Sequence, residues 1–256
     1  MHILLTNDDG IHAPGIWALC NRFVEKHAVT VIAPDREQSA VGHGITLHRP
    51  LRVTKVSIND SCAGYAVNGT PADCVKFAVL ELLESKPDLL ISGINPGANV
   101  GVNINYSGTV AAAKEAALYG ITAMAVSIQG YENPHYEEVA HFIEKLAHKV
   151  IDNGLSYGTY LNSNFPALPM SKICGIRISN LSVNFFPEHI EKRVDPRNRP
   201  YYWQGCDALP VSDNPDIDGS ALSERYISIT PLKCDVTDYD SIEVLKRWNL
   251  SISGGE

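Results

Sequence analysis

Two adjacent carboxylates follow an apolar run at the very start of the chain. Residues 4–10 read LLTNDDG, so Asp8 and Asp9 come directly after a segment with the character of a buried strand. Carboxylates bind hard divalent cations, and Gly10 allows the irregular turn that would direct neighbouring side chains toward one ion. Without a cation the two charges repel, and at least one pKa rises. A plain Asp-Gly turn explains these letters equally well when they are taken alone.

Two later loops carry polar side chains after strand-like segments. The first spans 34–42 (PDREQSAVG), and the second runs from 93 to 101 (GINPGANVG) and on to 109. In open parallel sheets, ligands bind beyond the carboxyl ends of the strands, so all three loops are expected at one edge. Their carboxylate, amide and hydroxyl oxygens suit Mg²⁺ or Mn²⁺ and not zinc. The sequence does not rank Ser39 above Asp35 or Glu37 as a ligand.

The third loop leads into a helix start at Ser107-Gly108-Thr109. Free N–H groups and the helix dipole favour an anion there, although a simple helix cap is the commoner meaning of this pattern. A cation at the first loop and an anion seat at the third would together bind a phosphoryl group, which polarised water could attack. His43 fits a solvated loop residue as well as a proton donor. The chain contains neither a P-loop nor a G-x-G-x-x-G motif.

The elements that must position these residues alternate between strand and helix. This alternation predicts βαβ units around a mostly parallel sheet. Strands are expected at 2–6, 28–33, 51–57, 65–67, 88–93, 121–128 and 227–232, and helices at 14–27, from 70, at 107–120, 135–154 and 241–249. We therefore expect an α/β fold, a Rossmann-like three-layer sandwich with a C-terminal extension. Residues 1–180 would form the catalytic domain, and 181–256 an arm rather than an independent domain.

Composition narrows the class of protein. The chain has 256 residues, of which 45% are apolar and 20% charged, as in soluble globular proteins. Its formal net charge of −8 argues against a nucleic-acid polymer as partner. Six scattered cysteines without C-x-x-C spacing fit reduced thiols. We find no signal peptide and no membrane span, so the cytoplasm is expected. Tyr201-Tyr202-Trp203 is expected to serve packing or an interface.

Several of these segments together resemble the SurE family, the stationary-phase survival nucleotidases. They are LLTNDDG, APDREQSAVG (33–42), NGTPADCV (68–75), SGINPGANVG (92–101), YSGTVAAAKEA (106–116), NFP (164–166) and ISITPL…TDYDS (227–241). The resemblance implies a metal-dependent phosphatase of nucleoside 5′-monophosphates and 3′-monophosphates, with short polyphosphate as a substrate of some members. It also implies a dimer or tetramer in which the C-terminal arm, strand and helix reach a neighbouring subunit.

The resemblance also assigns residues. The family's metal ligands fall on Asp8, Asp9, Ser39 and Asn95, which would hold one Mg²⁺ or Mn²⁺ per subunit. The family's phosphate pocket falls on Asn99, Ser107, Gly108 and Thr109. Arg225 stands where the family usually has a glycine, which concerns the arm more than the site. Residues 208–220 are hard to align and receive no role.

The leading hypothesis is therefore hydrolysis of a phosphomonoester by in-line attack of water, with Asp8 or Asp9 as the base. Asp8 is favoured because it follows the strand directly. An aspartyl-phosphate intermediate on Asp8 is less favoured, because phosphatases of that type place their carboxylates in a D-x-D pattern. The alternative from a different class is a nucleotide-binding sensor or assembly protein with little turnover.

Overall fold

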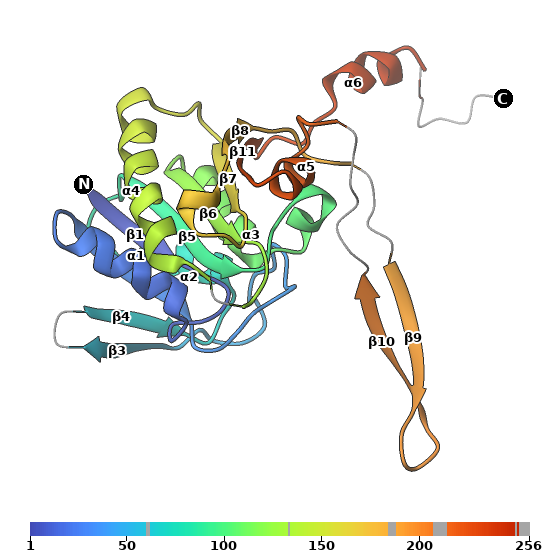
Figure 1. Ribbon diagram of the computed structural model, residues 1–256, viewed down its shortest axis with the longest axis horizontal. Helices are drawn as coiled ribbons and strands as arrows, with labels where there is room; N and C mark the ends of the chain where they lie inside the picture. The colour runs from blue at the N-terminus through green and yellow to red at the C-terminus, as the bar shows by residue number, and fades with distance from the viewer. Residues whose placement is uncertain (60–61, 133, 184–187, 207–213, 249, 251–256) are drawn as a thin grey trace.

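One nine-stranded sheet forms the centre of the computed structural model, and a separate two-stranded hairpin projects from the body (Figure 1). The structure describes residues 1–59, 62–132, 134–183, 188–206, 214–248 and 250. In spatial order the sheet contains β3 (Val53–Asn59), β4 (Cys62–Val67), β2 (Ala28–Pro34), β1 (His2–Thr6), β5 (Leu89–Pro96), β6 (Thr122–Ile128), β7 (Thr159–Phe165), β11 (Tyr226–Lys233) and β8 (Gly175–Ile178). Neighbouring strands from β4 to β7 are all parallel, which confirms the expected α/β class.

Helices cover both faces of the sheet and complete three layers. The helices are α1 (Pro14–Val24), α2 (Pro71–Phe77), α3 (Gly108–Leu118), α4 (Tyr136–Asn153), α5 (Asp218–Ser223) and α6 (Tyr239–Lys246), with short turns η1 (Ala78–Leu82), η2 (Gly101–Asn105) and η3 (Met170–Lys172). Helices α1 and α4 pack together on one face, and α2 and α3 pack together on the other (Figure 1). None of the helices in the described part of the chain is long and apolar enough to cross a bilayer.

The central strands are buried on both faces, which is why they read as continuous apolar runs. Successive side chains of a strand point to opposite faces. Ile3 and Leu5 accordingly join the core beneath α1 and α4, whereas Leu4 between them joins the core beneath α2 and α3. Each of the three side chains is fully buried. This two-sided burial fixes the end of β1, and with it the start of the loop that carries Asp8.

Local signals at the helix starts behave as expected from the sequence. Thr70 caps α2 in a reciprocal box, because its hydroxyl accepts the Asp73 N–H at 3.1 Å while its own N–H donates to the Asp73 carboxylate at 2.9 Å. Pro14 and Pro71 occupy first turns, where the absence of an N–H costs nothing. Ser107 caps α3 by accepting the Val110 N–H at 3.1 Å.

The C-terminal quarter contributes to the body and also leaves it. Strand β11 lies inside the sheet, antiparallel to β7 and parallel to β8. By contrast, the antiparallel hairpin of β9 (Glu188–Val194) and β10 (Pro200–Cys206) projects outward, as does α6 (Figure 1). Strands β7 and β8, the hairpin and α5 were not expected from the sequence. The 187–220 stretch, which contains the hairpin, is polar and without a clear period. The expected division at residue 180 stays a prediction, as does the role of 181–256; part of 208–220 falls outside the described residues.

Candidate active site

The order of the strands creates the site. After β1 the chain builds β2, β3 and β4 on one side of that strand, and then returns to place β5 on its other side. Strands β1 and β5 are parallel neighbours, with Leu5 opposite Ile91 and Thr6 opposite Ser92. The loops that leave them therefore diverge above a common crevice, the usual ligand position in such sheets. Asp8 and Asp9 leave β1 at this crevice, and Asn95 lies at the end of β5.

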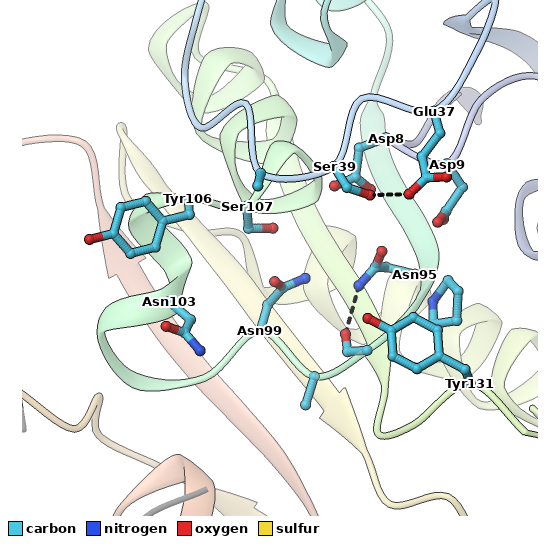
Figure 2. Close-up of a pocket in the computed structure, with 14 residues that line it drawn as sticks. Asp8, Asp9, Glu37, Ser39, Asn95, Asn99, Asn103, Tyr106, Ser107 and Tyr131 are labelled. Carbon is cyan, nitrogen blue, oxygen red and sulfur yellow. Dashed lines mark hydrogen bonds between the residues drawn. The ribbon is translucent and has the colours of Figure 1, made fainter. Parts of the chain in front are cut away.

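A pocket of about 330 Å³ lies at this edge. Its lining comes from all three polar loops that the sequence indicated, and Figure 2 shows their side chains around one space. The lining residues are Asp8, Asp9, Glu37, Ser39, Ala40, Asn95, Pro96, Gly97, Ala98, Asn99, Asn103, Tyr106, Ser107 and Tyr131. Asp35, which the sequence did not separate from Ser39, is absent from this lining in the described part of the chain.

Asp8 is held against the start of α3. The Thr109 hydroxyl donates to Asp8 Oδ1, and the Thr109 N–H donates to Oδ2 at 3.1 Å. Gly108 permits this approach, because a Cβ there would lie 2.8 Å from the Cβ of Asp8. The carboxylate is only 4% exposed, and this burial raises its pKa despite the hydrogen bonds from Thr109. The positive end of α3 thus orients Asp8 before any ligand arrives.

Asp9 differs from Asp8 in having an oxygen without a partner. Its Oδ2 is buried and accepts no hydrogen bond from the described residues. Burial, followed by the charges of Asp8 and Glu37, raises the pKa of Asp9 to about 7. Gly10 next to it has φ of +99° and makes the turn that the adjacent carboxylates need. A buried, unsatisfied carboxylate oxygen is costly unless something positive binds it.

Ser39, beside Asp8, and Asn95, across from it, add oxygen donors to those of the two carboxylates (Figure 2). The amide nitrogen of Asn95 donates to the Gly97 carbonyl at 2.6 Å, and Figure 2 shows its oxygen pointing toward Ser39 and Asp8. The Ser39 hydroxyl donates to Glu37 at 2.7 Å, so its lone pairs remain available. Carboxylate, amide and hydroxyl oxygens around a partnerless Asp9 oxygen fit a hard cation such as Mg²⁺ or Mn²⁺.

Asn99 and Ser107 border the other side of the pocket (Figure 2). Asn99 is firmly fixed, because its carbonyl accepts the side-chain N–H groups of Asn162 at 2.8 Å and Asn164 at 3.0 Å. Its side chain donates to Ser127 at 2.8 Å. Of the expected phosphate residues, these two face the pocket, whereas Gly108 and Thr109 contact Asp8. The start of α3 therefore both holds the Asp8 carboxylate and lines the pocket.

A hydrogen bond to a buried carboxylate ties the Ser39 loop to α3. His43 Nε2 lies 2.7 Å from an oxygen of Glu115, which is 7% exposed, and Lys76 lies 3.4 Å from the other oxygen. Burial alone would raise the pKa of Glu115, but the His43 hydrogen bond and the Lys76 charge outweigh it and hold the pKa below its usual value. Thus His43, which the sequence left between a solvated residue and a proton donor, is a structural tie on the same loop as Ser39.

Sequence reasoning missed three pocket residues. Asn103 lies in η2, Tyr106 directly follows η2, and Tyr131 lies in the loop after β6. Both tyrosine side chains are largely exposed at the mouth. For Asn103 and Tyr106, the only signal in the sequence was their position in the third loop. Tyr131 follows a strand end that the sequence did not connect with the site.

Sequence and structure comparisons find several related proteins. The family model described as "Survival protein SurE" matches residues 3–188. A protein named 5′-nucleotidase SurE from Desulfatibacillum aliphaticivorans is 52% identical over 250 residues, covering 98% of this chain and 99% of that protein. A protein of the same name from Syntrophobacter fumaroxidans is 48% identical, with 98% and 100% covered. The crystal structure of a SurE protein from Aquifex aeolicus matches with a TM-score of 0.84 and 37% identity, covering 97% and 99%.

Proposed function

The chain belongs to the SurE family of survival proteins, and from this premise we propose that its pocket removes phosphate from nucleoside 5′-monophosphates. It is a metal-dependent 5′-nucleotidase, a phosphoric monoester hydrolase. The observation that carries the proposal for the pocket is the partnerless, buried Oδ2 of Asp9 among oxygen donors from three loops. Such a donor set suits a divalent cation and, through it, a phosphoryl group.

Asp8, Asp9, Ser39 and Asn95 would hold one Mg²⁺ or Mn²⁺ per subunit. When bound, the cation neutralises charge on the phosphoryl oxygens and polarises water for attack on phosphorus. Asn99 and Ser107 would orient the remaining phosphoryl oxygens, since both line the opposite side of the pocket. Gly108 and Thr109 would act on this arrangement through Asp8, which their amides help to fix.

Either carboxylate could accept the proton of the attacking water. The sequence favoured Asp8, but the hydrogen bonds favour Asp9 instead. Thr109 donates to both Asp8 oxygens, whereas Oδ2 of Asp9 accepts no hydrogen bond from the described residues. A general base needs an oxygen that can accept the proton within hydrogen-bond reach. We therefore propose that Asp8 serves only as an oriented ligand, whereas Asp9 is a ligand that also accepts the proton.

Metal-dependent phosphate release is the direct test. We expect the protein to release phosphate from AMP or GMP in the presence of Mg²⁺ or Mn²⁺, to stop in the presence of a chelator, and to recover when the metal is restored. The four proposed ligands are all oxygen donors, so removal of the cation leaves the carboxylates repelling an anionic substrate. Nucleotide binding without metal-dependent release would refute the hydrolase and favour the sensor with little turnover.

The finer expectations remain proposals about the same pocket and the C-terminal arm. A panel of 5′-monophosphates, 3′-monophosphates and short polyphosphate would define the substrate range. We propose a dimer or tetramer in which the arm exchanges between subunits. Large apolar side chains that are exposed in one subunit support this, namely Ile190, Tyr202, Trp203, Val236, Trp248 and Leu250. We also propose the cytoplasm as the compartment, since Cys74, Cys174 and Cys234 form no disulfide.

Loss of the His43 tie should weaken catalysis without removing any ligand. We expect His43→Ala to lower kcat/KM about 10-fold, the size expected for one partly buried, charge-assisted hydrogen bond, because the Ser39 loop would lose its contact with Glu115. His43→Gln, which can still donate, should recover part of the loss. Steady-state kinetics across a range of Mg²⁺ concentrations would measure the effect. His48→Ala, at an exposed position of the same segment, is the matched control; equal losses in both variants would contradict this role.

A further inference from the structure

A second group of ligating side chains lies at the opposite end of the strands from the pocket. His27, Glu144 and His148 each offer a ligand atom, and these three atoms lie within 4.8 Å of one another. Glu144 and His148 are one turn apart on α4, and His27 directly precedes β2, which begins at Ala28. The group therefore lies at the amino ends of the strands, where α1 and α4 pack side by side (Figure 1). The active-site pocket lies beyond the carboxyl ends.

The His27 ring is an anomaly that calls for a ligand. Both of its nitrogens are buried, and neither has a hydrogen-bond partner among the described residues. Its ring lies 5.9 Å from that of Phe23 and 5.4 Å from that of His148, measured between ring centroids. Buried polar atoms are nearly always satisfied, and an exception commonly marks a missing water or ion. An imidazole with a free nitrogen beside a second imidazole is a typical metal-binding arrangement.

Glu144 can serve as the third ligand without losing its orientation. It is 4% exposed, and its Oε2 accepts the Arg22 Nε–H at 2.6 Å. Its Oε1 accepts a hydrogen bond from Lys26 Nζ at 3.1 Å, and the Lys26 side chain is 57% exposed. Exposed lysine pairs contribute little stability, so an ion can displace Lys26 while Arg22 still holds the other oxygen. An outer contact of this kind commonly fixes a metal ligand.

We propose that His27, Glu144 and His148 bind a divalent transition-metal ion of the zinc class, at a site separate from the oxygen-lined pocket. Three points within 4.8 Å of each other fit inside a circle of radius about 2.8 Å, so a central ion starts at most that far from each atom. Shifts below about 1 Å then reach the 2.0–2.1 Å of zinc–nitrogen and zinc–oxygen bonds. Two imidazoles select Zn²⁺, Ni²⁺ or Cu²⁺, whereas the oxygen pocket selects Mg²⁺ or Mn²⁺.

The expected consequence is stabilisation of the folded chain. An ion shared by His27, in the turn between α1 and β2, and by α4 binds the folded state and not the unfolded one. It would thus tie this turn to α4, at the end of the sheet opposite the reacting groups. The site is independent of the proposed hydrolysis, and its metal would stabilise without being required for turnover.

The test isolates this site by first removing the other. In the Asp8→Asn/Asp9→Asn double variant, we expect calorimetry to find one Zn²⁺ per subunit and saturating Zn²⁺ to raise Tm by roughly 5 °C. Mg²⁺ should do neither. Adding His148→Ala, at an exposed position, should abolish both effects, and His27→Gln should do the same. His141→Ala, also exposed on α4, is the matched control and should change nothing.

Cobalt provides a second readout of the same ligands. Co²⁺ bound by two imidazoles and a carboxylate should give the visible absorption of a four-coordinate site, and His148→Ala should remove it. Zinc binding that persists unchanged in the His148→Ala and His27→Gln variants would overturn the proposal, as would a Tm that does not respond to Zn²⁺. Mg²⁺-dependent phosphate release should be unchanged in His148→Ala, which distinguishes this site from the active one.

Discussion

Asp8→Asn should lower the rate of phosphate release from a nucleoside 5′-monophosphate by about 10³-fold or more. This corresponds to a loss of roughly 4 kcal/mol in transition-state stabilisation. Asn keeps the size of the side chain but removes the negative charge. It also cannot accept hydrogen bonds at both positions where Thr109 donates. Steady-state kinetics at saturating Mg²⁺ would measure the loss.

The control for this variant is a neighbouring acid that the pocket does not use. Asp35→Asn removes one negative charge from the second loop, yet Asp35 is exposed and is absent from the described lining of the pocket. Its rate should stay close to that of the unchanged protein. A near-normal rate for Asp8→Asn would contradict the proposed site, and equal losses in both variants would assign the effect to net charge.

Attack by water can be distinguished from covalent catalysis on Asp8 by looking for a phosphorylated aspartate. A phosphorylated aspartate would require an Asp8 oxygen to approach phosphorus in line, but both oxygens accept hydrogen bonds from Thr109. We therefore expect mass spectrometry of the rapidly quenched reaction to find no phosphorylated Asp8. The adjacency of the two acids, rather than a D-x-D spacing, leads to the same expectation.

The sequence predicted the central sheet because physical constraints are strongest there. Strands such as β1 and β5 are buried on both faces, so their apolar runs are visible without any tertiary information. Caps such as Thr70 and Ser107 are equally local. The β9–β10 hairpin was missed because it is polar, exposed and paired only with itself. Nothing in its pattern of side chains indicates which residues face inward.

The site was predictable in its loops but not in its contacts. Three strand ends at one edge follow from the parallel sheet, which is why the loops that carry Asp8, Ser39 and Asn95 could be brought together in advance. The choice of Ser39 over Asp35 and Glu37 came from the family resemblance. That Thr109 would bind Asp8 could not be foreseen, because this contact joins residues 101 positions apart. The cluster of His27, Glu144 and His148 could not be foreseen for the same reason. A Glu-x-x-x-His pair on a helix is readable in sequence, but the approach of His27, from the turn between α1 and β2, is not.

The site should also destabilise the protein while it holds no cation. Burial and the charges of Asp8 and Glu37 raise the folded-state pKa of Asp9 from 3.8 to about 7. The unfolded chain releases this proton near pH 4, whereas the folded chain keeps it until about pH 7. Between these values the folded state binds one more proton, so the free energy of unfolding falls as pH rises. Above about pH 7 the folded protein carries the full loss of stability that comes from burying the charged Asp9.

Asp9→Asn should therefore stabilise the metal-free protein while it abolishes turnover. At pH 8 in the presence of a chelator, we expect its free energy of unfolding to exceed that of the unchanged protein by roughly 2 to 4 kcal/mol. The difference should shrink toward pH 5, where the folded protein still carries the Asp9 proton. Urea unfolding at the two pH values measures both quantities, and Asp35→Asn, at an exposed position, should show neither effect.

Adding Mg²⁺ should reverse the order of stability at pH 8. The unchanged protein gains free energy by binding the cation, whereas Asp9→Asn lacks one of the two carboxylates that bind it. A buried carboxylate that destabilises the metal-free protein and stabilises the cation-bound protein is retained for function, since the stability of the metal-free protein alone would favour Asn. A metal-free Asp9→Asn protein less stable than the unchanged one at pH 8 would show that Asp9 stabilises the fold, and would contradict its retention for function at a cost in stability.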